Sequence, residues 1–353
     1  MLVETVLLRR RAAARLGDVA DWLFTDEALQ QATAAPVAAH RARRLAGRVV
    51  HDVTCSVGTE LAALRRQAAY VLGSDIDAVR LAMAARNVPG VPLCRADALQ
   101  PITGEAVVLA DPARRSAGRR RFSPRDYTPP LDLLLGVYAD RDLVVKCSPG
   151  IDFSRLRFDG EVEVTSWAGS VREACLWSPG LTQPGVSRRA SVLRADGSAE
   201  VITDAEPDSC AVGPAGRWIV DPDGAIVRAG LVRHYAARHG LWQLDPDIAY
   251  LSGDQLPSGV RGFELLEQIP FGERRLRQAL AALDCGAVEI LVRGVDVDPA
   301  RLRPRLRLNG GRALSVVITR IGPGGSARAM AFICRPHDCA ASTLAPNSLG
   351  KDG

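Results

Sequence analysis

Val49-Val50-His51-Asp52-Val53-Thr54-Cys55-Ser56-Val57-Gly58 is the stretch that decides the fold of this chain. Its apolar first half predicts a short buried strand, and its second half predicts a tight turn into a helix over residues 59–69. A second strand is expected over residues 71–77, where it ends in acidic side chains. Because strand, helix and strand follow one another, the pattern indicates a parallel sheet.

The same alternation continues toward the C-terminus. We expect a helix over residues 78–87, and strands over residues 91–95, 105–110 and 143–146. Two β-rich runs, residues 161–167 and 172–177, predict an antiparallel pair that closes the sheet. The predicted fold class is α/β, with a mostly parallel sheet covered by helices on both faces.

The sequence predicts five parts along the chain. Residues 1–45 are rich in Ala, Leu and Arg and predict a short N-terminal helical extension. The sheet domain covers residues 46–180, and a linker or small β excursion covers residues 181–217. Alternating helical and β-rich segments predict a second, smaller α/β domain over residues 218–338. We expect the tail, residues 339–353, to be disordered.

Composition indicates a cytoplasmic protein. The chain has 353 residues, of which 47% are hydrophobic, so a sizeable core can be buried. No apolar run reaches the roughly 18 residues that span a bilayer. At the N-terminus the basic residues follow the apolar run, the reverse of a secretory signal. The formal charge of +5 permits nucleic-acid binding without showing it, because the chain has 43 arginines and only two lysines, Lys146 and Lys351.

The eight cysteines predict neither a disulfide framework nor a metal site. They are scattered along the chain, and no Cys-x-x-Cys pair occurs. Cys334 and Cys339 flank His337, but two thiols and one imidazole are too few for a confident metal site. We therefore expect reduced, partly buried thiols and no bound metal.

Acidic side chains end three successive strands and predict a nucleotide-binding edge. Asp52 opens the turn that Gly58 ends, Asp75 ends the second strand, and Asp97 follows the third. Open α/β sheets bind ligands at this edge, where a carboxylate can accept the hydroxyls of a ribose and another can meet an adenine. The candidate cofactor-binding residues are Asp52, Thr54, Cys55, Ser56, Gly58, Asp75, Ile76, Asp97 and Ala98. Taken singly, each aspartate could instead be a turn residue or a helix cap.

These segments resemble the S-adenosylmethionine-binding half of class I methyltransferases, which have a Rossmann-like sheet. Over nearly its full length, the chain resembles a bacterial group that joins this domain to a C-terminal THUMP-like domain. The resemblance rests on residues 52–60, 73–77, 95–97, 111–115, 266–271 and 285–294. It implies S-adenosylmethionine as cofactor, held by the loop from Asp52 to Gly58 and by Asp75 and Asp97. One departure is Ser56, which occupies the first position of the usual Gly-x-Gly.

Asp111 and Pro112 follow the fourth predicted strand and are the candidate catalytic residues. They resemble the Asp/Asn-Pro-Pro-aromatic turn of methyltransferases that modify exocyclic amines. A carboxylate there could hold an amine with its lone pair aimed at the methyl group. Ala113 and Arg114 replace the second proline and the aromatic residue, so Phe122 or Tyr127 would have to supply the stacking ring. An ordinary strand-ending turn is the alternative.

An arginine-rich segment follows this turn and predicts contacts with RNA phosphates. The candidate RNA-binding residues are Arg114, Arg115, Arg119, Arg120, Arg121 and Phe122. A solvated loop in an arginine-rich chain explains the same segment equally well. THUMP domains are RNA-binding modules, so the resemblance adds to the RNA interpretation. The leading hypothesis is methylation of a nucleobase nitrogen in structured RNA, tRNA or rRNA.

Other functions remain open at this stage. The chain could methylate a small molecule or a protein, or it could be a non-catalytic RNA-binding protein that retains the fold. A dinucleotide-dependent oxidoreductase is disfavoured because Gly-x-Gly-x-x-Gly is absent. Cys147 ends the fifth strand, near where RNA cytosine-C5 methyltransferases place a nucleophile, but a partly buried thiol is the preferred interpretation. The oligomeric state does not follow from the sequence.

Overall fold

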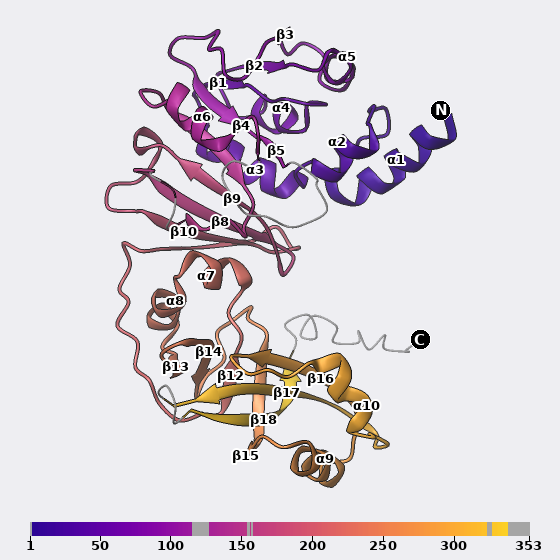
Figure 1. The fold of residues 1–353 in the computed structure, drawn as a ribbon, viewed down its shortest axis with the longest axis vertical. Helices are drawn as coiled ribbons and strands as arrows, with labels where there is room; N and C mark the ends of the chain where they lie inside the picture. The colour runs from indigo at the N-terminus through magenta and orange to yellow at the C-terminus, as the bar shows by residue number, and fades with distance from the viewer. Residues whose placement is uncertain (1, 115–126, 154–155, 157, 323–326, 338–353) are drawn as a thin grey trace, which may run out of the picture. The chain divides into compact units, whose positions relative to one another are not determined.

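The computed structural model describes residues 2–114, 127–153, 156, 158–322 and 327–337. The chain divides into two compact units (Figure 1). The first contains Met1–Ala205 together with Asp223–Leu231, and the second contains Glu206–Pro222 together with Val232–Gly353. Each unit has its own sheet.

The first unit is built on a sheet with the strand order β11-β10-β8-β9-β7-β4-β1-β2-β3. The strands are β1 (Val49–Asp52), β2 (Tyr70–Asp75), β3 (Leu93–Arg95), β4 (Val107–Ala110), β7 (Leu143–Cys147), β8 (Glu161–Trp167), β9 (Ser170–Trp177), β10 (Arg188–Leu193) and β11 (Ala199–Thr203). From β7 to β3 all neighbours are parallel, and β9 is antiparallel to β7 and β8. The predicted mostly parallel sheet with an antiparallel closing strand is confirmed.

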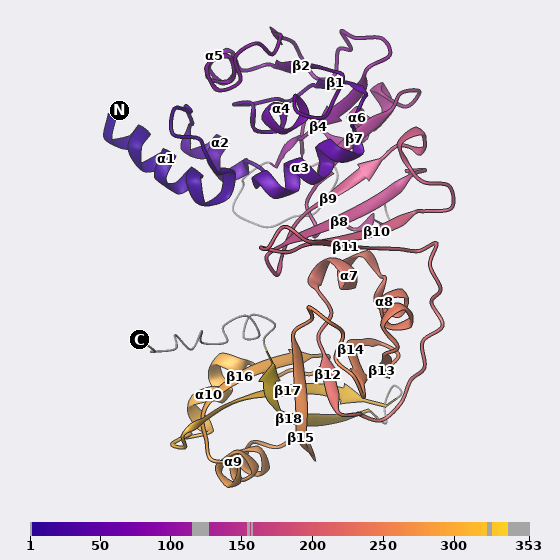
Figure 2. The ribbon, with the colours of Figure 1, turned by 180° about the vertical axis from the view of Figure 1, so that it is seen from behind.

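Apolar side chains place the centre of this sheet in the core. All four residues of β4 and all five of β7 are buried, as expected for strands covered on both faces. The helices of the first unit are α1 (Leu2–Leu16), α2 (Asp26–Gln31), α3 (Ala35–Arg44), α4 (Thr59–Leu64), α5 (Ala78–Asn87), α6 (Leu131–Val137) and α7 (Gly224–Ala229). The side chain of Asp77 caps α5 by accepting hydrogen bonds from the backbone of Val79 and Arg80. Both ribbon views show α3 packed beside α4 and β8 (Figures 1 and 2).

Within residues 181–217, predicted as a linker or small β excursion, two strands extend this sheet. Strand β10 pairs in parallel with β8, and β11 returns antiparallel to β10. The partner of β10 comes earlier in the chain, with β9 and a loop between them, so no hairpin signal marks the pairing. Ser191-Val192-Leu193 was expected to be a β segment, but its place in the first sheet was not predicted.

The second unit has the strand order β13-β14-β12-β15-β18-β17-β16. Its strands are β12 (Trp218–Val220), β13 (Trp242–Asp245), β14 (Ile248–Gly253), β15 (Gly262–Pro270), β16 (Cys285–Arg293), β17 (Arg312–Ile321) and β18 (Arg328–His337). Its helices are α8 (Val232–His239), α9 (Glu273–Ala282) and α10 (Pro299–Arg305), of which α9 and α10 pack beside β16. Leu276, Leu280 and Leu302 bury the inner faces of these two helices. The predicted smaller α/β domain is thus present.

Among the described residues, no helix is long and apolar enough to cross a bilayer. Within the same residues, no group of three or more His, Cys, Asp or Glu side chains could hold a metal ion. Cys334 is buried in β18, and Cys339 lies outside the described part of the chain.

Candidate functional site

A cavity of about 530 Å³ opens at the carboxyl ends of the parallel strands in the first unit. The turns after β1, β2, β3 and β4 line it on one side, and α2 and residues 128–130 line it on the other. Nine of the residues singled out from the sequence meet here. They are Asp52, Thr54, Cys55, Ser56, Asp75, Ile76, Asp97, Ala98 and Asp111. The volume is within the range typical of small-molecule sites.

The turn after β1 brings backbone donors toward the second strand. The backbone N–H of Ser56 donates to Oδ2 of Asp75 at 2.9 Å, and that of Cys55 donates to the carbonyl of Ser74 at 2.9 Å. Ser56 has a φ of 48°, in the left-handed region that glycine adopts without strain. The serine therefore adopts a backbone conformation that glycine, the usual residue at this position of the motif, would take without strain.

Gly58 has a structural role in the turn, and its predicted contact with the cofactor stays a prediction. It does not line the cavity, although it was placed among the cofactor contacts. Its φ is 92°, and it stands at the N-cap of α4. A Cβ at this position would approach Cγ2 of Val88 to 3.0 Å. The glycine lets the chain turn into α4 while α5 packs against it.

The carboxylates of Asp75 and Asp97 already serve the local turns. Asp75 accepts from the backbone N–H groups of Ser56 and Asp77, each at 2.9 Å, and Asp97 accepts from that of Leu99 at 2.9 Å. A carboxylate has about four lone-pair sites, so both groups keep capacity for a ligand. The capping role and the ligand-binding role are therefore compatible.

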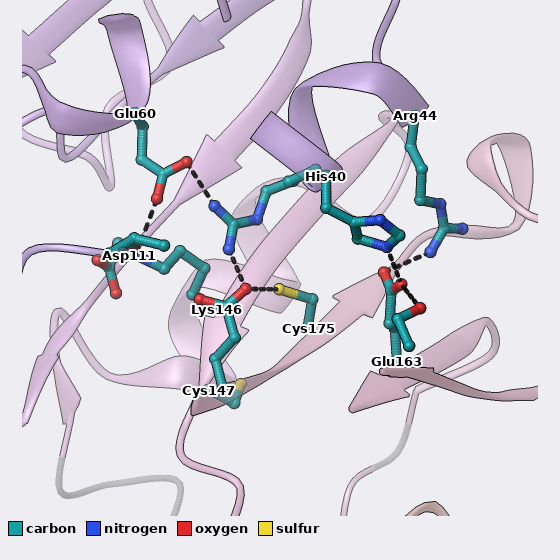
Figure 3. A network of polar contacts seen from close by, with 12 residues as sticks. His40, Arg44, Glu60, Asp111, Lys146, Cys147, Glu163 and Cys175 are labelled. Carbon is teal, nitrogen blue, oxygen red and sulfur yellow. Dashed lines mark hydrogen bonds and ion pairs between the residues drawn. The ribbon is translucent and has the colours of Figure 1, made fainter. Parts of the chain in front are cut away.

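Asp111 faces the cavity from the end of β4 and is fixed at both its backbone and its side chain. Its backbone N–H donates to Oγ1 of Thr54 at 2.6 Å. Its Oδ2 forms an ion pair with the ammonium of Lys146, which comes from β7 (Figure 3). The side chain of Asp111 is 35% exposed, whereas that of Lys146 is 6% exposed. The lysine thus lies behind the aspartate and away from the cavity.

Comparison with known proteins identifies the family. Two relatives from strains of Mycobacterium tuberculosis, both named S-adenosylmethionine-dependent methyltransferase, are 66% identical over 348 residues, which cover 95% of this chain and 96% of theirs. The chain belongs to the S-adenosylmethionine-dependent methyltransferases. A family model described as THUMP domain-like matches residues 260–336 of the second unit. A candidate methyltransferase of Porphyromonas gingivalis shares the fold, with a TM-score of 0.73, 20% identity and coverage of 94% of this chain and 88% of that one.

The cavity of this methyltransferase fits its cofactor. Asp75 and Asp97 offer lone pairs at the ends of adjacent strands, as a nucleoside requires. Asp52 lines the cavity and is 1% exposed, and its Oδ2 has no hydrogen-bond partner among the described residues. Burial, together with the charge of Glu60, raises the pKa of Asp52 well above its usual value. A protonated Asp52 can donate a hydrogen bond to a polar ligand group.

A network of buried charges supports the Asp111 side of the methyltransferase cavity. Glu60 of α4 lies 3.2 Å from the ammonium of Lys146 and also forms an ion pair with Arg41 of α3. Arg41 contacts Glu173 of β9 as well. Burial alone would raise the pKa of Glu60, but Arg41 and Lys146 lower it to about 2. Burial alone would lower the pKa of Lys146, but Asp111 and Glu60 raise it. Both groups are therefore charged at neutral pH.

Sequence reasoning missed Lys146 and Glu60. One signal was present, because Lys146 is one of only two lysines in an arginine-rich chain and it stands in a buried strand. Glu60 belonged to the quoted motif, but no role had been assigned to it. The pairing of β7 with β4, and of β4 with β1, on which α4 packs, brings these side chains together.

Other predicted residues of the methyltransferase lie outside the cavity lining. Pro112 is buried beside Asp111 and does not line the cavity. Arg114 belongs to β5 (Ala113–Arg114), which pairs with β6 (Tyr127–Thr128), and its side chain is not described. Residues outside the described part are Arg115, Arg119, Arg120, Arg121 and Phe122.

Tyr127 is 3% exposed, and its hydroxyl accepts from the backbone of Ser148 at 2.9 Å, so its ring cannot stack on a base. Cys147 is 6% exposed, which favours the buried-thiol interpretation.

Proposed function

We propose that this methyltransferase acts on structured RNA, tRNA or rRNA, and methylates a nucleobase nitrogen at the Asp111 side of the cavity. The observation that carries the proposal is the presence in one chain of a strand-end cavity with a fixed carboxylate and a THUMP domain-like segment. When bound, S-adenosylmethionine supplies a methyl group already activated on a sulfonium. The protein then has to orient the acceptor and accept its proton.

The proposed cofactor contacts come from three strand ends. Asp75 would accept the ribose hydroxyls through the lone pairs that Ser56 and Asp77 leave free. Asp97 and Ala98 would meet the adenine, and Asp52 with residues 54–56 would meet the amino-acid tail. All of these residues line the same cavity.

Asp111 is proposed to hold the acceptor. One carboxylate oxygen is paired with Lys146, which leaves the other oxygen to accept an N–H from an exocyclic amine. Such a hydrogen bond would direct the nitrogen lone pair, and the carboxylate would stabilise the positive charge that develops on the nitrogen. Pro112 keeps the backbone of this turn stiff.

RNA binding is proposed for the second unit. Helix α9 is amphipathic: Leu276 and Leu280 are buried, while Arg274, Arg275 and Arg277 are exposed. Three guanidinium groups on one exposed face suit a phosphate backbone. The family match to a THUMP domain-like model covers this helix.

The test measures transfer of a labelled methyl group from S-adenosylmethionine to total tRNA and to rRNA, with calorimetric titration of the cofactor as a separate measurement. Charge reversal of Arg274, Arg275 and Arg277 to Glu should weaken RNA binding at least tenfold and spare cofactor binding. The matched control reverses Arg65, Arg66 and Arg86, which are exposed at the far ends of α4 and α5 from the cavity. Equal loss of RNA binding in both variants, or no RNA methylation by the wild type, would refute the RNA assignment.

A further inference from the structure

The ammonium of Lys146 has three partners from three different parts of the first unit. It contacts Oγ1 of Thr33 before α3, Oε1 of Glu60 in α4 at 3.2 Å, and Oδ2 of Asp111 after β4. The ammonium donates hydrogen bonds to Thr33 and Asp111, whereas its contact with Glu60 is an ion pair without a hydrogen bond. Three contacts from different elements thereby fix the position of the nitrogen.

Asp111 and Glu60 line the cavity, whereas Lys146 does not. The side chain of Asp111 is 35% exposed, whereas those of Lys146 and Glu60 are each 6% exposed. A ligand in the cavity therefore meets a carboxylate before the ammonium, and Asp111 is the more exposed of the two. Lys146 therefore acts on the ligand through Asp111.

The remaining freedom of Asp111 lies in its side chain. Its backbone N–H is already held by Thr54 at 2.6 Å, and the hydroxyl oxygen that accepts it belongs to the turn after β1. A carboxylate on a fixed backbone can still rotate among rotamers. The ion pair with a buried, three-partner ammonium removes that freedom.

We propose that Lys146 is a positioning residue for methyl transfer, which holds one carboxylate oxygen of Asp111 so that the other faces the acceptor side of the cavity. This inference rests on the proposed role of Asp111. In the same network the planar guanidinium of Arg41 spans two acceptors, Glu60 and Glu173. The compact ammonium stands where three acceptors converge, a geometry that arginine does not match.

An equilibrium measurement can test the inference without any acceptor. Sinefungin carries an amine where the cofactor carries its methylated sulfur, and S-adenosylhomocysteine lacks the methyl group. The ratio of the two dissociation constants therefore reports how favourably the protein surrounds a cationic group at the position of the transferred methyl group. Calorimetry would give this ratio for the wild type, Asp111→Asn, Lys146→Met and the double variant. Arg189→Met is the matched control, because Arg189 forms a buried ion pair with Glu161 away from the cavity.

We expect the wild type to bind sinefungin roughly five- to tenfold more tightly than S-adenosylhomocysteine, through a charge-assisted hydrogen bond to Asp111. Asp111→Asn and Lys146→Met should each reduce the ratio to within twofold of unity, and the double variant should match the single ones. Arg189→Met should keep the wild-type ratio. If Lys146→Met does not fold, Thr33→Val removes one anchor of the ammonium and should lower the ratio two- to threefold.

The direction of the change separates the possible outcomes. A lysine that acted only through its own positive charge would repel the amine, so Lys146→Met would raise the ratio. A raised or unchanged ratio, together with a loss in Asp111→Asn, overturns the positioning role and leaves the role of Asp111 intact. An unchanged ratio in Asp111→Asn refutes the proposed role of Asp111, and the positioning role of Lys146 falls with it.

Discussion

Two networks of buried charges lie between α3 and the sheet of the first unit, and they differ in where they end (Figure 3). The cavity network comprises Thr33, Arg41, Glu60, Lys146, Asp111 and Glu173. The enclosed network comprises His40, Arg44, Glu161, Glu163, Arg189 and Ser191. The cavity network ends on a carboxylate that is about one-third exposed, whereas no charged side chain of the enclosed network is more than 16% exposed. Similar chemistry therefore borders a cavity in one case and packs a helix on the sheet in the other.

The largest expected effect comes from breaking the enclosed network at its centre. Glu161 is fully buried and pairs with both Arg44 and Arg189, so Glu161→Gln leaves two buried cations with one counter-charge fewer. We expect the free energy of unfolding to fall by about 3–5 kcal/mol. Urea denaturation measures this, and cofactor affinity in the folded fraction should stay within twofold. A stable variant with weakened cofactor binding would mean that the two networks are not functionally separate.

Breaking the cavity network at its exposed end should affect turnover instead. Asp111→Asn retains the shape of the side chain but removes the charge, so we expect methyl transfer to RNA to slow by about 100- to 1000-fold. Cofactor affinity should remain within threefold of the wild type. Single-turnover transfer of a labelled methyl group and calorimetry measure the two quantities. Loss of cofactor binding would show that Asp111 contacts the cofactor rather than the acceptor.

Lowering the pH should first reduce stability through His51 of β1, a buried neutral group that belongs to neither network. Its ring nitrogens contact Thr103 at 3.1 Å and Ser74 at 2.9 Å, and burial together with the charge of Arg141 lowers its pKa to about 4. Between pH 6.5 and 4 the unfolded state binds the proton and the folded state does not, so stability should fall as pH falls, by up to about 3 kcal/mol.

Glu60 loses its contribution in the same direction but at lower pH. Its pKa is lowered to about 2, so its contribution is present in full above its ordinary pKa and is lost as pH falls from there through 2. Urea denaturation at several pH values should therefore show a slope between pH 6.5 and 4 that disappears in His51→Gln. A slope that persists in this variant would assign the acid sensitivity to other groups.

Asp75 lines the cavity at the end of β2 and belongs to neither charged network, so a substitution there tests the proposed ribose site. Asp75→Asn keeps the size of the side chain but weakens the acceptance of hydroxyl and backbone donors. We expect cofactor affinity to fall by about 10- to 100-fold, measured by calorimetry. Unchanged affinity in a folded protein would contradict the assignment of the ribose site. Thermal unfolding provides the control, because Asp75 also accepts from two backbone N–H groups.

The smallest effects are expected in the turn after β1. Ser56→Gly relieves a left-handed serine, so stability should change by no more than about 1 kcal/mol, with cofactor affinity within twofold. Gly58→Ala places a Cβ against Val88 at a φ of 92° and should cost about 2 kcal/mol. Denaturation of the two variants side by side measures both changes. A larger loss in Ser56→Gly would show that its hydroxyl makes an essential contact.

The fold was largely predictable because its signals are local. Apolar runs that end in acids, as in residues 49–58 and 71–77, predicted the parallel half of the sheet, and these two runs supply nine of the residues that line the cavity. Pairings between segments distant in sequence were not predictable, which explains why the segment of β10 was expected to be a linker or small β excursion rather than a strand beside β8. The same reason hid Lys146, because only the packing of β7 against β4 and α4 shows that it contacts Asp111 and Glu60.

The order of segments along the chain has a consequence for dissecting the protein. The first unit ends at Ala205, gives way to Glu206–Pro222 of the second unit, and resumes with Asp223–Leu231, which includes α7. Helix α7 packs on β8, β9 and β10, and Arg228 donates to the carbonyls of Pro149 and Ile151. A single cut therefore cannot yield both units intact, because it either removes α7 from the first unit or removes β12 from the second. Truncation, proteolysis or exchange of parts with a relative must treat the two units as interleaved pieces of one chain.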